Sequence, residues 1–455
     1  MNARSTTRRP AAPARRPAVE PREGRQLMSA SIVNGWVNVI GTSGNDVITV
    51  GTWNGQYTVT ENGQTTILAG TVNKIYVDAG AGNDVVKVAP QITKAAILVG
   101  GLGDDALYGA GGADFLYGGA GNDRLYAGAG ASVDWLYGED GNDTLVAVGG
   151  GADHLLGGNG TDNLWFGTGD QTDLTATEVL GGWVHNIGKF ANGASIEPAG
   201  QNLADPGLQD YAAHYGPLSS DTPLFAATGP KMDDVRQGGL GDCWFMSGLA
   251  SVAKAKPDVI RQAVTELGDG TYAVRYFDDG AAKYYRVDAQ LARKNSNNAV
   301  IFAQPGNNSL WVPIMEKAYA FHRSDSHQYK EMNSGWGDET MQALGKYTES
   351  DDVIWHSNST LATNMRNRLL AGGAVTACTD PAILGCSIVP SHCYSVVAVS
   401  SDLKTITLRN PWGLDGKTKY SDGKTTFSDS SNDGYIKISM DQFGDDVWQI
   451  QYGWL

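Results

Sequence analysis

The chain has 455 residues, of which 41% are hydrophobic, and a formal net charge of −15. This length corresponds to two or three domains of about 150 residues, and no apolar run reaches the ~18 residues that cross a bilayer. Residues 1–28 hold seven arginines and two glutamates and contribute +5, which leaves −20 for the rest. An acidic body of this kind repels nucleic-acid phosphates, which argues against nucleic acid as a partner, and it is compatible with binding divalent cations.

The first segment, residues 1–29, is rich in Arg, Ala and Pro and is predicted to be disordered. It lacks the apolar stretch of an ordinary secretory signal. Residues 19–30, VEPREGRQLMSA, resemble the LEPR-XLL segment at the N-termini of large exported bacterial surface proteins. The resemblance implies an extracellular or cell-surface location in a bacterium, and a solvated basic tail is the alternative on composition.

A glycine-rich repeat occupies residues 100–170, in units such as GGLGDDALY and GGAGNDRLY. Each unit combines a glycine turn, which permits positive φ, with a short apolar strand. The leucines two positions after each aspartate are predicted to stack as an internal ladder. The aspartates carry the hard oxygen ligands that Ca²⁺ prefers. The predicted metal ligands are Asp105, Asp114, Asp123, Asp134, Asp143, Asp153 and Asp162.

This pattern resembles the RTX nonapeptide repeat, which implies a parallel β-roll that binds Ca²⁺ between successive turns. The alternative, a flexible glycine-rich linker, does not explain why leucine and aspartate stay in phase. Aligned carboxylates repel one another without a cation, so the roll is predicted to be unfolded when Ca²⁺ is absent. Alternating strand patterns predict a β-rich cap over residues 30–99.

The composition changes after residue 170, where residues 171–219 are predicted to form a linker. Residues 243–255 show helical spacing of apolar side chains, with Asp242 as the expected N-cap. A thiol at a helix N-terminus is stabilised as a thiolate, which makes Cys243 the candidate nucleophile. No helix N-terminus accompanies the other cysteines, Cys378, Cys386 and Cys393. In an oxidising compartment, Cys378 and Cys386 can form a disulfide.

A thiol nucleophile needs a base, and His392 opens a predicted strand 149 residues after Cys243. Asn410 follows at the end of another predicted strand, where its amide can hold the imidazole in the productive tautomer. The remaining histidines are predicted to be structural: His154, His185, His214, His322, His327 and His356.

The motifs RQGGLGDCWF, LWVPIMEKAYA, SHCYSVVAV and LRNPWG resemble the calpain family of cysteine proteases, in order, over residues 220–455. The resemblance implies a papain-like α+β fold of two subdomains that hydrolyses protein or peptide substrates. Cys243 is then the nucleophile, His392 the general base and acid, and Asn410 its orienting partner. The resemblance also implies that Gln237, six residues before the cysteine, donates a hydrogen bond to the oxyanion. It implies further that Trp412 shields the Asn410–His392 hydrogen bond from water. The expected architecture is multi-domain, with the β-roll preceding the protease.

The calpain resemblance also implies calcium sites within the protease. The calpain resemblance places one site's carboxylates at Asp234 and Glu339, for which ordinary surface acids are an equal alternative. Residues 414–429, LDGKTKYSDGKTTFSD, lack the tryptophans that the family has after its NPWG motif. This departure puts a second site in question.

Two other functions remain open. A calcium-binding surface adhesin or scaffold without catalytic activity would use the roll alone, although the complete set of catalytic residue types argues against it. A papain-fold acyl transferase such as a transglutaminase would have an aspartate where Asn410 stands. The hypothesis for the roll is that low cytosolic calcium leaves it slack and external calcium folds it, so that export and folding are calcium-gated.

Overall fold

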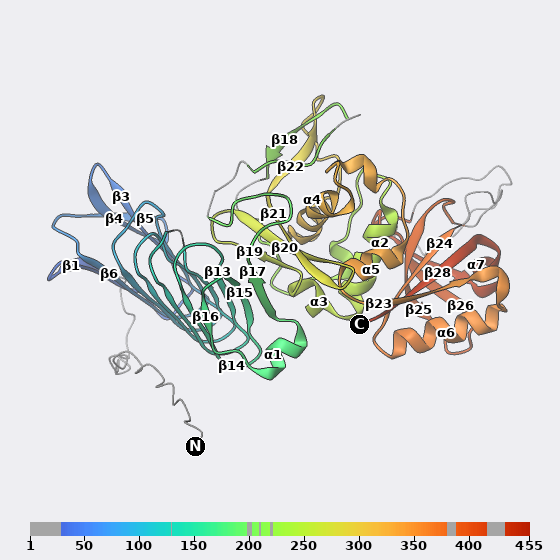
Figure 1. Cartoon of the computed structure of the whole chain (residues 1–455), viewed down its shortest axis with the longest axis horizontal. Helices are drawn as coiled ribbons and strands as arrows, with labels where there is room; N and C mark the ends of the chain where they lie inside the picture. Colours follow the sequence, from blue (N-terminus) through green and yellow to red (C-terminus); the bar gives the residue numbers. More distant parts are fainter. Residues whose placement is uncertain are drawn as a thin grey trace, which may run out of the picture.

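The computed structural model describes residues 29–128, 130–197, 203–208, 211–218, 222–379, 388–415 and 433–455. The predicted N-terminal tail, Cys386 and most of residues 414–429 lie outside these ranges. Figure 1 shows an elongated molecule in which a β-roll, blue to green, leads into a mixed α/β part, green to red. No helix of the described residues is long and apolar enough to span a membrane.

The roll consists of two sheets that face each other, one of eight and one of nine strands. Successive strands alternate between the sheets, and their pairing is parallel from β6 and β7 through β17. In spatial order, the first sheet contains β1 (Ser29–Val33), β2 (Trp36–Ile40), β6 (Lys74–Ala81), β8 (Ala96–Leu102), β10 (Phe115–Ala120), β12 (Trp135–Asp140), β14 (His154–Asn159) and β16 (Gln171–Thr172). The second contains β17 (Val184–Ile187), β15 (Asn163–Gly167), β13 (Thr144–Ala147), β11 (Arg124–Tyr126), β9 (Ala106–Tyr108), β7 (Val85–Val88), β3 (Val47–Trp53), β4 (Gln56–Glu61) and β5 (Gln64–Leu68).

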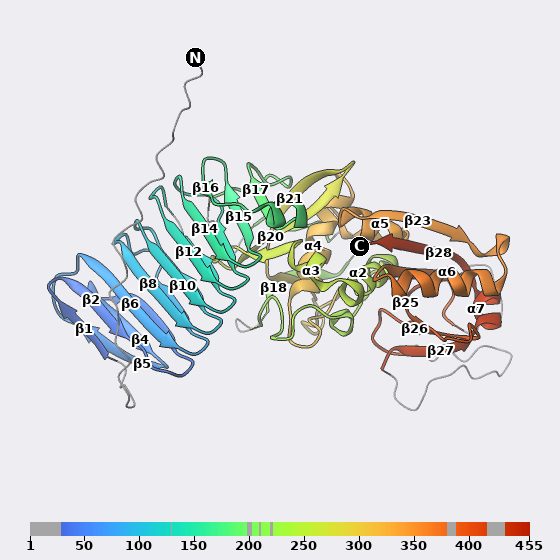
Figure 2. The same ribbon diagram turned by 90° about the horizontal axis from the view of Figure 1, so that it is seen from below.

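The parallel β-roll predicted from the repeats is thus present, and it is longer than residues 100–170. The same two sheets continue without a break into the N-terminal strands, where the pairing turns antiparallel at β1–β2 and at β3–β4–β5. The stretch predicted as a cap therefore forms the first rungs of the roll. Figure 2 shows these strands stacked in line with the later ones.

The predicted leucine ladder exists as two ladders, because each nonapeptide makes only half a turn. Leu107, Leu125, Leu145 and Leu164 are in register in one sheet. Leu98, Leu116, Leu136 and Leu155 are in register in the other. All eight leucines are fully buried between the sheets, so no strand buries its apolar face without its neighbours.

Glycine is required where successive turns touch. Gly101 has φ +116°, and a Cβ there would lie 2.0 Å from the carbonyl oxygen of Gly80 on the preceding turn. Only a residue without a side chain allows two turns to approach this closely.

The end of the roll packs on the next part of the chain. A separate hydrophobic cluster joins Tyr126, Val146 and Trp165 of the second sheet to Ala273. Trp165 is fully buried, and its ring meets that of Tyr284 edge-on at 6.1 Å between centroids. Polar contacts reinforce the junction, since the Arg275 guanidinium donates to the Gly182 carbonyl at 3.0 Å. The roll therefore shares a core with the α/β part.

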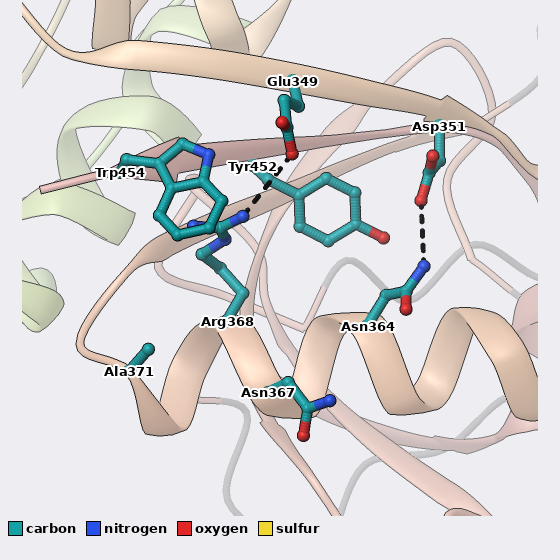
Figure 3. Close-up of a pocket in the computed structure, with 8 residues that line it drawn as sticks. All are labelled: Glu349, Asp351, Asn364, Asn367, Arg368, Ala371, Tyr452 and Trp454. Atoms are coloured by element: carbon teal, nitrogen blue, oxygen red, sulfur yellow. Dashed lines mark hydrogen bonds and ion pairs between the residues drawn. The ribbon is translucent and has the colours of Figure 1, made fainter.

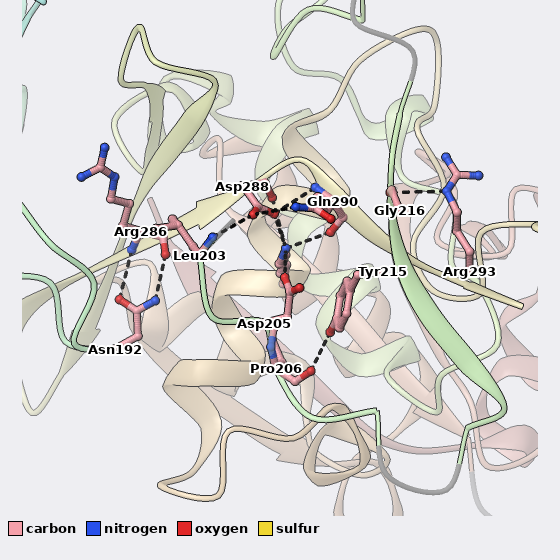
Figure 4. A network of polar contacts seen from close by, with 11 residues as sticks. Asn192, Leu203, Asp205, Pro206, Tyr215, Gly216, Arg286, Asp288, Gln290 and Arg293 are labelled. Atoms are coloured by element: carbon pink, nitrogen blue, oxygen red, sulfur yellow. Dashed lines mark hydrogen bonds and ion pairs between the residues drawn. The ribbon is translucent and has the colours of Figure 1, made fainter. Parts of the chain in front are cut away.

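The segment between these parts, predicted as a linker, is held along the protein surface. Arg286 donates through Nη1 to the carbonyls of Ser195 and Glu197 at 2.6 and 2.5 Å. Further along, the buried Lys317 forms ion pairs with Asp205 and Asp288. Figure 4 shows two further contacts of this segment with β21, between Asn192 and the Arg286 backbone and between Leu203 and Asp288.

The α/β part has two hydrophobic cores. The first surrounds the helices α2 (Cys243–Ala255), α3 (Pro257–Arg261), α4 (Trp311–Arg323) and α5 (Gly337–Ala343), with β19 (Val264–Glu266), β20 (Thr271–Asp278) and β21 (Ala281–Asp288) as one sheet and β18 (Ala213–Pro217) with β22 (Gln290–Lys294) as another. The second surrounds a six-stranded sheet in the order β23 (Tyr347–Asp352), β28 (Val447–Trp454), β24 (Ala374–Thr379), β25 (Cys393–Val399), β26 (Thr405–Arg409) and β27 (Tyr435–Ser439), flanked by α6 (Asn358–Leu370) and α7 (Met440–Asp446). A short helix, α1 (Ala176–Gly181), closes the roll.

Replacing Trp165 by alanine should destabilise the junction between the roll and the α/β part. The change removes a fully buried indole from a small cluster, so the free energy of unfolding should fall by about 3–5 kcal/mol. Trp53 is 64% exposed, and Trp53→Ala is the matched control, with an expected change within about 0.5 kcal/mol. Denaturant unfolding of both variants measures the difference, and equal effects would contradict a shared core.

Candidate active site

Cys243 is the first residue of α2, as predicted, and α2 lies against the central strands of the six-stranded sheet. The Ser395 hydroxyl on β25 donates to the Ser247 carbonyl at 2.8 Å, and the Ser251 hydroxyl donates to the Val375 carbonyl on β24 at 2.9 Å. Two hydrogen bonds one helical turn apart fix the helix relative to the sheet. The Cys243 thiol meets the backbone N–H of Cys393, the first residue of β25.

His392 and Asn410 form the hydrogen bond expected from the sequence. His392 precedes β25 and Asn410 follows β26, and Nε2 of the imidazole lies 2.9 Å from Oδ1 of the amide. The backbone N–H of Trp412 also donates to this Oδ1, at 3.0 Å. The shared atom is thus an acceptor, so Nε2 carries the proton and Nδ1 is left as the basic nitrogen.

Trp412 covers the histidine. Its ring lies 4.6 Å from that of His392, at an interplanar angle of 48°. His392 and Asn410 are both buried, while Trp412 is partly exposed. The indole therefore separates the His392–Asn410 hydrogen bond from solvent, where water would compete for it.

Burial favours the neutral forms of the Cys243 thiol and the His392 imidazole in this arrangement. It raises the pKa of the Cys243 thiol to about 11, with a smaller contribution from the charge of Asp242, while the backbone N–H of Cys393 acts in the opposite direction. Burial also lowers the pKa of His392 to about 4, against the effect of Asn410. Among the described residues, no hydrogen bond joins Cys243 to His392. The site is therefore a thiol beside a neutral imidazole.

Gln237 links the two halves of the site through its backbone, because its N–H donates to the Pro411 carbonyl at 2.8 Å. Its side-chain Nε2 donates to the Leu240 carbonyl at 2.6 Å and to Oδ1 of Asp242 at 3.2 Å. Both amide hydrogens therefore have acceptors within the protein. Because its donor is engaged in this way, the role of Gln237 as an oxyanion donor stays a prediction.

Asp242 departs from its predicted role as an N-cap. It occupies the N-cap position of α2, but its side chain makes no capping hydrogen bond. It is fully buried and meets the buried Glu316 of α4. Burial raises the pKa of Asp242 to about 7, and burial together with the Asp242 charge raises the pKa of Glu316 well above its ordinary value. Two buried carboxyl groups in contact are stable only if they share a proton.

The cysteines pair differently from the bridge considered above. A disulfide joins Cys378 to Cys393, which face each other on β24 and β25. Cys386 lies outside the described residues. The cross-strand register explains this pairing, since it brings the two Cα atoms to 4.1 Å. Of the described cysteines, Cys243 alone is free.

The roll aspartates form two columns along its edges. In one, each Oδ1 accepts the backbone N–H of the aspartate one turn earlier at 2.7–2.9 Å, through Asp46, Asp84, Asp105, Asp123, Asp143 and Asp162. The other column holds Asp114, Asp134, Asp153 and Asp170. Both columns extend beyond the predicted ligands, and Glu178 ends the first by accepting from the Asp162 N–H. Asp84 was visible in the sequence as an isolated repeat unit.

These columns suit a cation. The second carboxylate oxygen is buried and has no hydrogen-bond partner in Asp84, Asp105, Asp123, Asp143, Asp153 and Asp162. In four turns it points at a glycine of its own turn, and in three of these a backbone carbonyl of the next turn lies beside that glycine. A buried oxygen of this kind fits Ca²⁺, which also accepts backbone carbonyl ligands. No cluster of three or more His, Cys, Asp or Glu side chains that could hold a metal occurs among the described residues, so carbonyls would complete each site.

Asp234 and Glu339 have separate partners. The Asp234 carboxylate is buried and accepts from the Trp311 indole at 2.8 Å, the Asn307 amide at 2.9 Å and the Lys231 backbone at 2.8 Å. Glu339 pairs with Arg323. Both carboxylates thus have protein partners in this arrangement, and their role as calcium ligands stays a prediction.

A cavity of about 450 Å³ lies elsewhere, between α6 and the strands β23 and β28. Figure 3 shows Arg368 beside Trp454 and paired with Glu349 in this cavity. None of the predicted catalytic residues lines it. The cavity therefore does not mark the site of the thiol.

Comparison with known proteins agrees with this geometry. The calpain family cysteine protease profile matches residues 216–452, just over half of the chain. The chain belongs to the calpain family. RTX calcium-binding nonapeptide repeats match residues 99–133, 130–150 and 146–170. The two matches imply that this calpain-family protein binds Ca²⁺.

Individual calpains match over the same part of the chain. Human calpain-8 is 27% identical over 213 residues, which is 42% of this chain and 29% of calpain-8. The rice calpain-type cysteine protease ADL1 is 29% identical over 43% of this chain and 10% of its own length. Calpain clp-4 of Caenorhabditis elegans is 28% identical over 45% and 31%. The chain thus spans less than a third of the length of these relatives.

Without calcium, the roll should be more stable at low pH than at high pH. Burial raises the pKa of Asp114 to about 6, of Asp105 to about 7 and of Asp134 to about 8. Between pH 4 and 8 the folded roll thus binds more protons than the unfolded chain, so stability falls as pH rises. Circular dichroism in chelator should show more strand at pH 5 than at pH 8.

Saturating Ca²⁺ should remove this pH difference, because the cation replaces the protons on the carboxylates. Equal strand content in chelator and in Ca²⁺ at pH 8 would contradict calcium-dependent folding of the roll.

Proposed function

We propose that the chain is a calcium-dependent cysteine endopeptidase with a papain-like fold of two subdomains. The observation that carries the proposal is the His392–Asn410 hydrogen bond of 2.9 Å under Trp412, beside the helix that begins at Cys243. The two hydrophobic cores, one largely helical and one built on the six-stranded sheet, support the two subdomains. The substrate class is proteins or peptides.

In the proposed reaction, Sγ of Cys243 attacks a peptide carbonyl carbon while Nδ1 of His392 takes the thiol proton. The resulting imidazolium then gives this proton to the departing amine, and a thioester with Cys243 remains. Water attacks the thioester, His392 accepts a proton from it, and the carboxylic acid product leaves as the thiol re-forms. Asn410 keeps the imidazole in the tautomer that exposes Nδ1.

The oxyanion formed in each step needs hydrogen-bond donors. The backbone N–H of Cys243, at the first position of α2, is one, and Nε2 of Gln237 is the other. Because this Nε2 now donates to the Leu240 carbonyl and to Asp242, Gln237 must release at least one of these contacts when substrate binds. The Gln237–Pro411 backbone hydrogen bond keeps it at the site meanwhile.

Calcium is proposed to act through the roll, held by the aspartates of the two columns and by backbone carbonyls. The cation would compensate buried negative charge and so fold the roll, which the shared cluster at Trp165 connects to the catalytic part. We place the working protein at the surface of a bacterium or outside it, where calcium is available, and propose that low cytosolic calcium keeps the roll slack during export. Asp234 and Glu339 remain candidates for a further site.

Replacing Cys243 by serine should abolish cleavage of casein or of a fluorogenic peptide library in millimolar Ca²⁺. A serine hydroxyl at this site lacks the nucleophilicity of the thiol, so kcat should fall by at least about a thousandfold. Cys386→Ser, which also removes one sulfur, should stay active. Wild-type protein that neither cleaves peptides nor reacts with an active-site thiol probe would favour a calcium-binding adhesin or scaffold instead.

Replacing Gln237 by alanine should lower kcat/KM by about a hundredfold to a thousandfold, which corresponds to ~2.7–4 kcal/mol of transition-state stabilisation. KM should change little, because the donor acts on the oxyanion rather than on bound substrate. Steady-state kinetics on one peptide checks this split. A rise in KM at constant kcat would show that Gln237 binds substrate instead.

A further inference from the structure

The disulfide lies at the backbone that holds the catalytic histidine. Cys393 directly follows His392, and its partner Cys378 lies opposite on β24. Next to the bridge, the His392 N–H donates to the Thr379 hydroxyl at 3.0 Å, and the Thr379 N–H donates to the His392 carbonyl at 2.8 Å. The Thr379 hydroxyl also donates to the His392 carbonyl, at 3.1 Å. Three hydrogen bonds to Thr379 and the disulfide of the adjacent Cys393 thus tie His392 to the end of β24.

Beyond this point β24 offers His392 no further support within the described residues, because the strand ends at Thr379. The Thr379 hydroxyl also donates to the Val389 carbonyl. The position of the imidazole therefore depends on how firmly the ends of β24 and β25 are held together.

The free thiol lies over the same place. Along α2 and β25, Ser247 contacts Ser395, and one helical turn back from Ser247 brings the chain to Cys243. Cys393 lies two residues before Ser395 on β25. Two strand residues and one helical turn both span about 6 Å, which brings Cys243 and Cys393 to the same level. The effect of the Cys393 backbone N–H on the thiol agrees with this placement. Three cysteines therefore meet at the catalytic histidine, two of them oxidised.

We propose that the Cys378–Cys393 disulfide positions His392, so that the working enzyme holds this pair oxidised and Cys243 alone reduced. The proposal rests on the proposed function, because it assigns to the bridge the placement of the general base. Cys378 and Cys393 are positioning residues, since neither touches the reacting carbonyl. A protease of this design works best where disulfides persist. This requirement agrees with the proposed extracellular location.

The redox step is a two-electron exchange. The Cys378 and Cys393 thiols each lose a proton, and their two electrons reduce an external low-molecular-weight disulfide to two thiols. Both cysteines are buried, whereas Cys243 is partly exposed. A mild reductant should therefore restore an oxidised Cys243 before it opens the bridge.

The register also predicts a trap. If Cys378 is missing, the Cys393 thiol is free beside Cys243, and the same external disulfide can oxidise these two to a Cys243–Cys393 bridge. That bridge consumes the nucleophile. The variant should then lose activity without reductant and regain part of it with reductant, which a loss of packing alone would not cause.

The test compares four full-length proteins in Ca²⁺: wild type, Cys378→Ala, Cys378→Ala/Cys393→Ala, and Cys386→Ala as the matched control. Non-reducing peptide mapping by mass spectrometry identifies the pairs independently of activity. Wild type and the control should contain the 378–393 pair, and Cys378→Ala kept in oxidised glutathione should contain the 243–393 pair. Circular dichroism confirms that each variant is folded.

Peptide kinetics then measures positioning. The double variant, which cannot form the trap, should lose between about tenfold and a hundredfold in kcat with KM within about twofold, because misplacing the base by an ångström has effects of this size. Wild type treated with a strong phosphine reductant should show the same loss without any mutation. This second measurement decides the question if the double variant does not fold.

The outcomes separate the two proposals. A wild type that is inactive in every redox state overturns the proposed function, and the peptide map still tests the pairing. A wild type with the 378–393 pair whose kcat is unchanged in the double variant and after full reduction overturns the positioning role. A 378–386 pair in the map overturns the proposal at its origin.

Discussion

Buried carboxyl groups without a protein cation are the constraint on which this structure depends. In the columns of the roll, one carboxylate oxygen of an aspartate accepts a backbone N–H of the preceding turn. In six of these aspartates the other oxygen is buried without a hydrogen-bond partner. Such a group must be neutralised by a proton or by a bound cation. The repeated register of the sheets creates this need at every turn, so the feature that defines the roll also makes its stability depend on solution conditions.

The same constraint recurs behind Cys243, where a different arrangement meets it. Asp242 and Glu316 are buried together, and the backbone N–H of Ala303 donates to both Glu316 oxygens at 3.1 Å. A shared proton suffices there, because Asp242 also accepts from Gln237. A set of packed groups joins the two regions. Trp165 meets Tyr284 on β21, and on the neighbouring β20 the Tyr276 hydroxyl donates to the Met315 carbonyl of α4. The ring centroids of Tyr319 on α4 and Phe245 on α2 lie 4.3 Å apart. Calcium in the roll and the thiol at the start of α2 thus belong to one contiguous packed body.

The sequence predicted the elements that carry the site because each has a local signature. The helix at Cys243–Ala255 begins and ends as expected, and His392 and Asn410 flank strands as expected. The phase of leucine and aspartate predicted the roll, although the division into two ladders follows from three-dimensional winding. What depends on contacts between distant segments could not be read locally: the docking of Trp165, the Cys378–Cys393 pair, and the side chain of Asp242 turning from its helix toward Glu316. Only the cross-strand register distinguishes Cys393 from Cys386 as a partner.

In the proposed mechanism, the pKa values of Cys243 and His392 determine how the thiolate nucleophile forms. The pKa values of about 11 for Cys243 and about 4 for His392 differ by seven pH units, so moving the proton to the imidazole costs on the order of 10 kcal/mol before the ions attract each other. Burial therefore favours the neutral thiol and imidazole over the thiolate–imidazolium pair in this arrangement. In the proposed mechanism, the thiol loses its proton as Sγ bonds to carbon, when negative charge passes to the oxyanion and the donors of Cys243 and Gln237 can stabilise it. Under that mechanism, Gln237 is held in place by Pro411 but must first release a hydrogen bond of its amide before it can donate to the oxyanion.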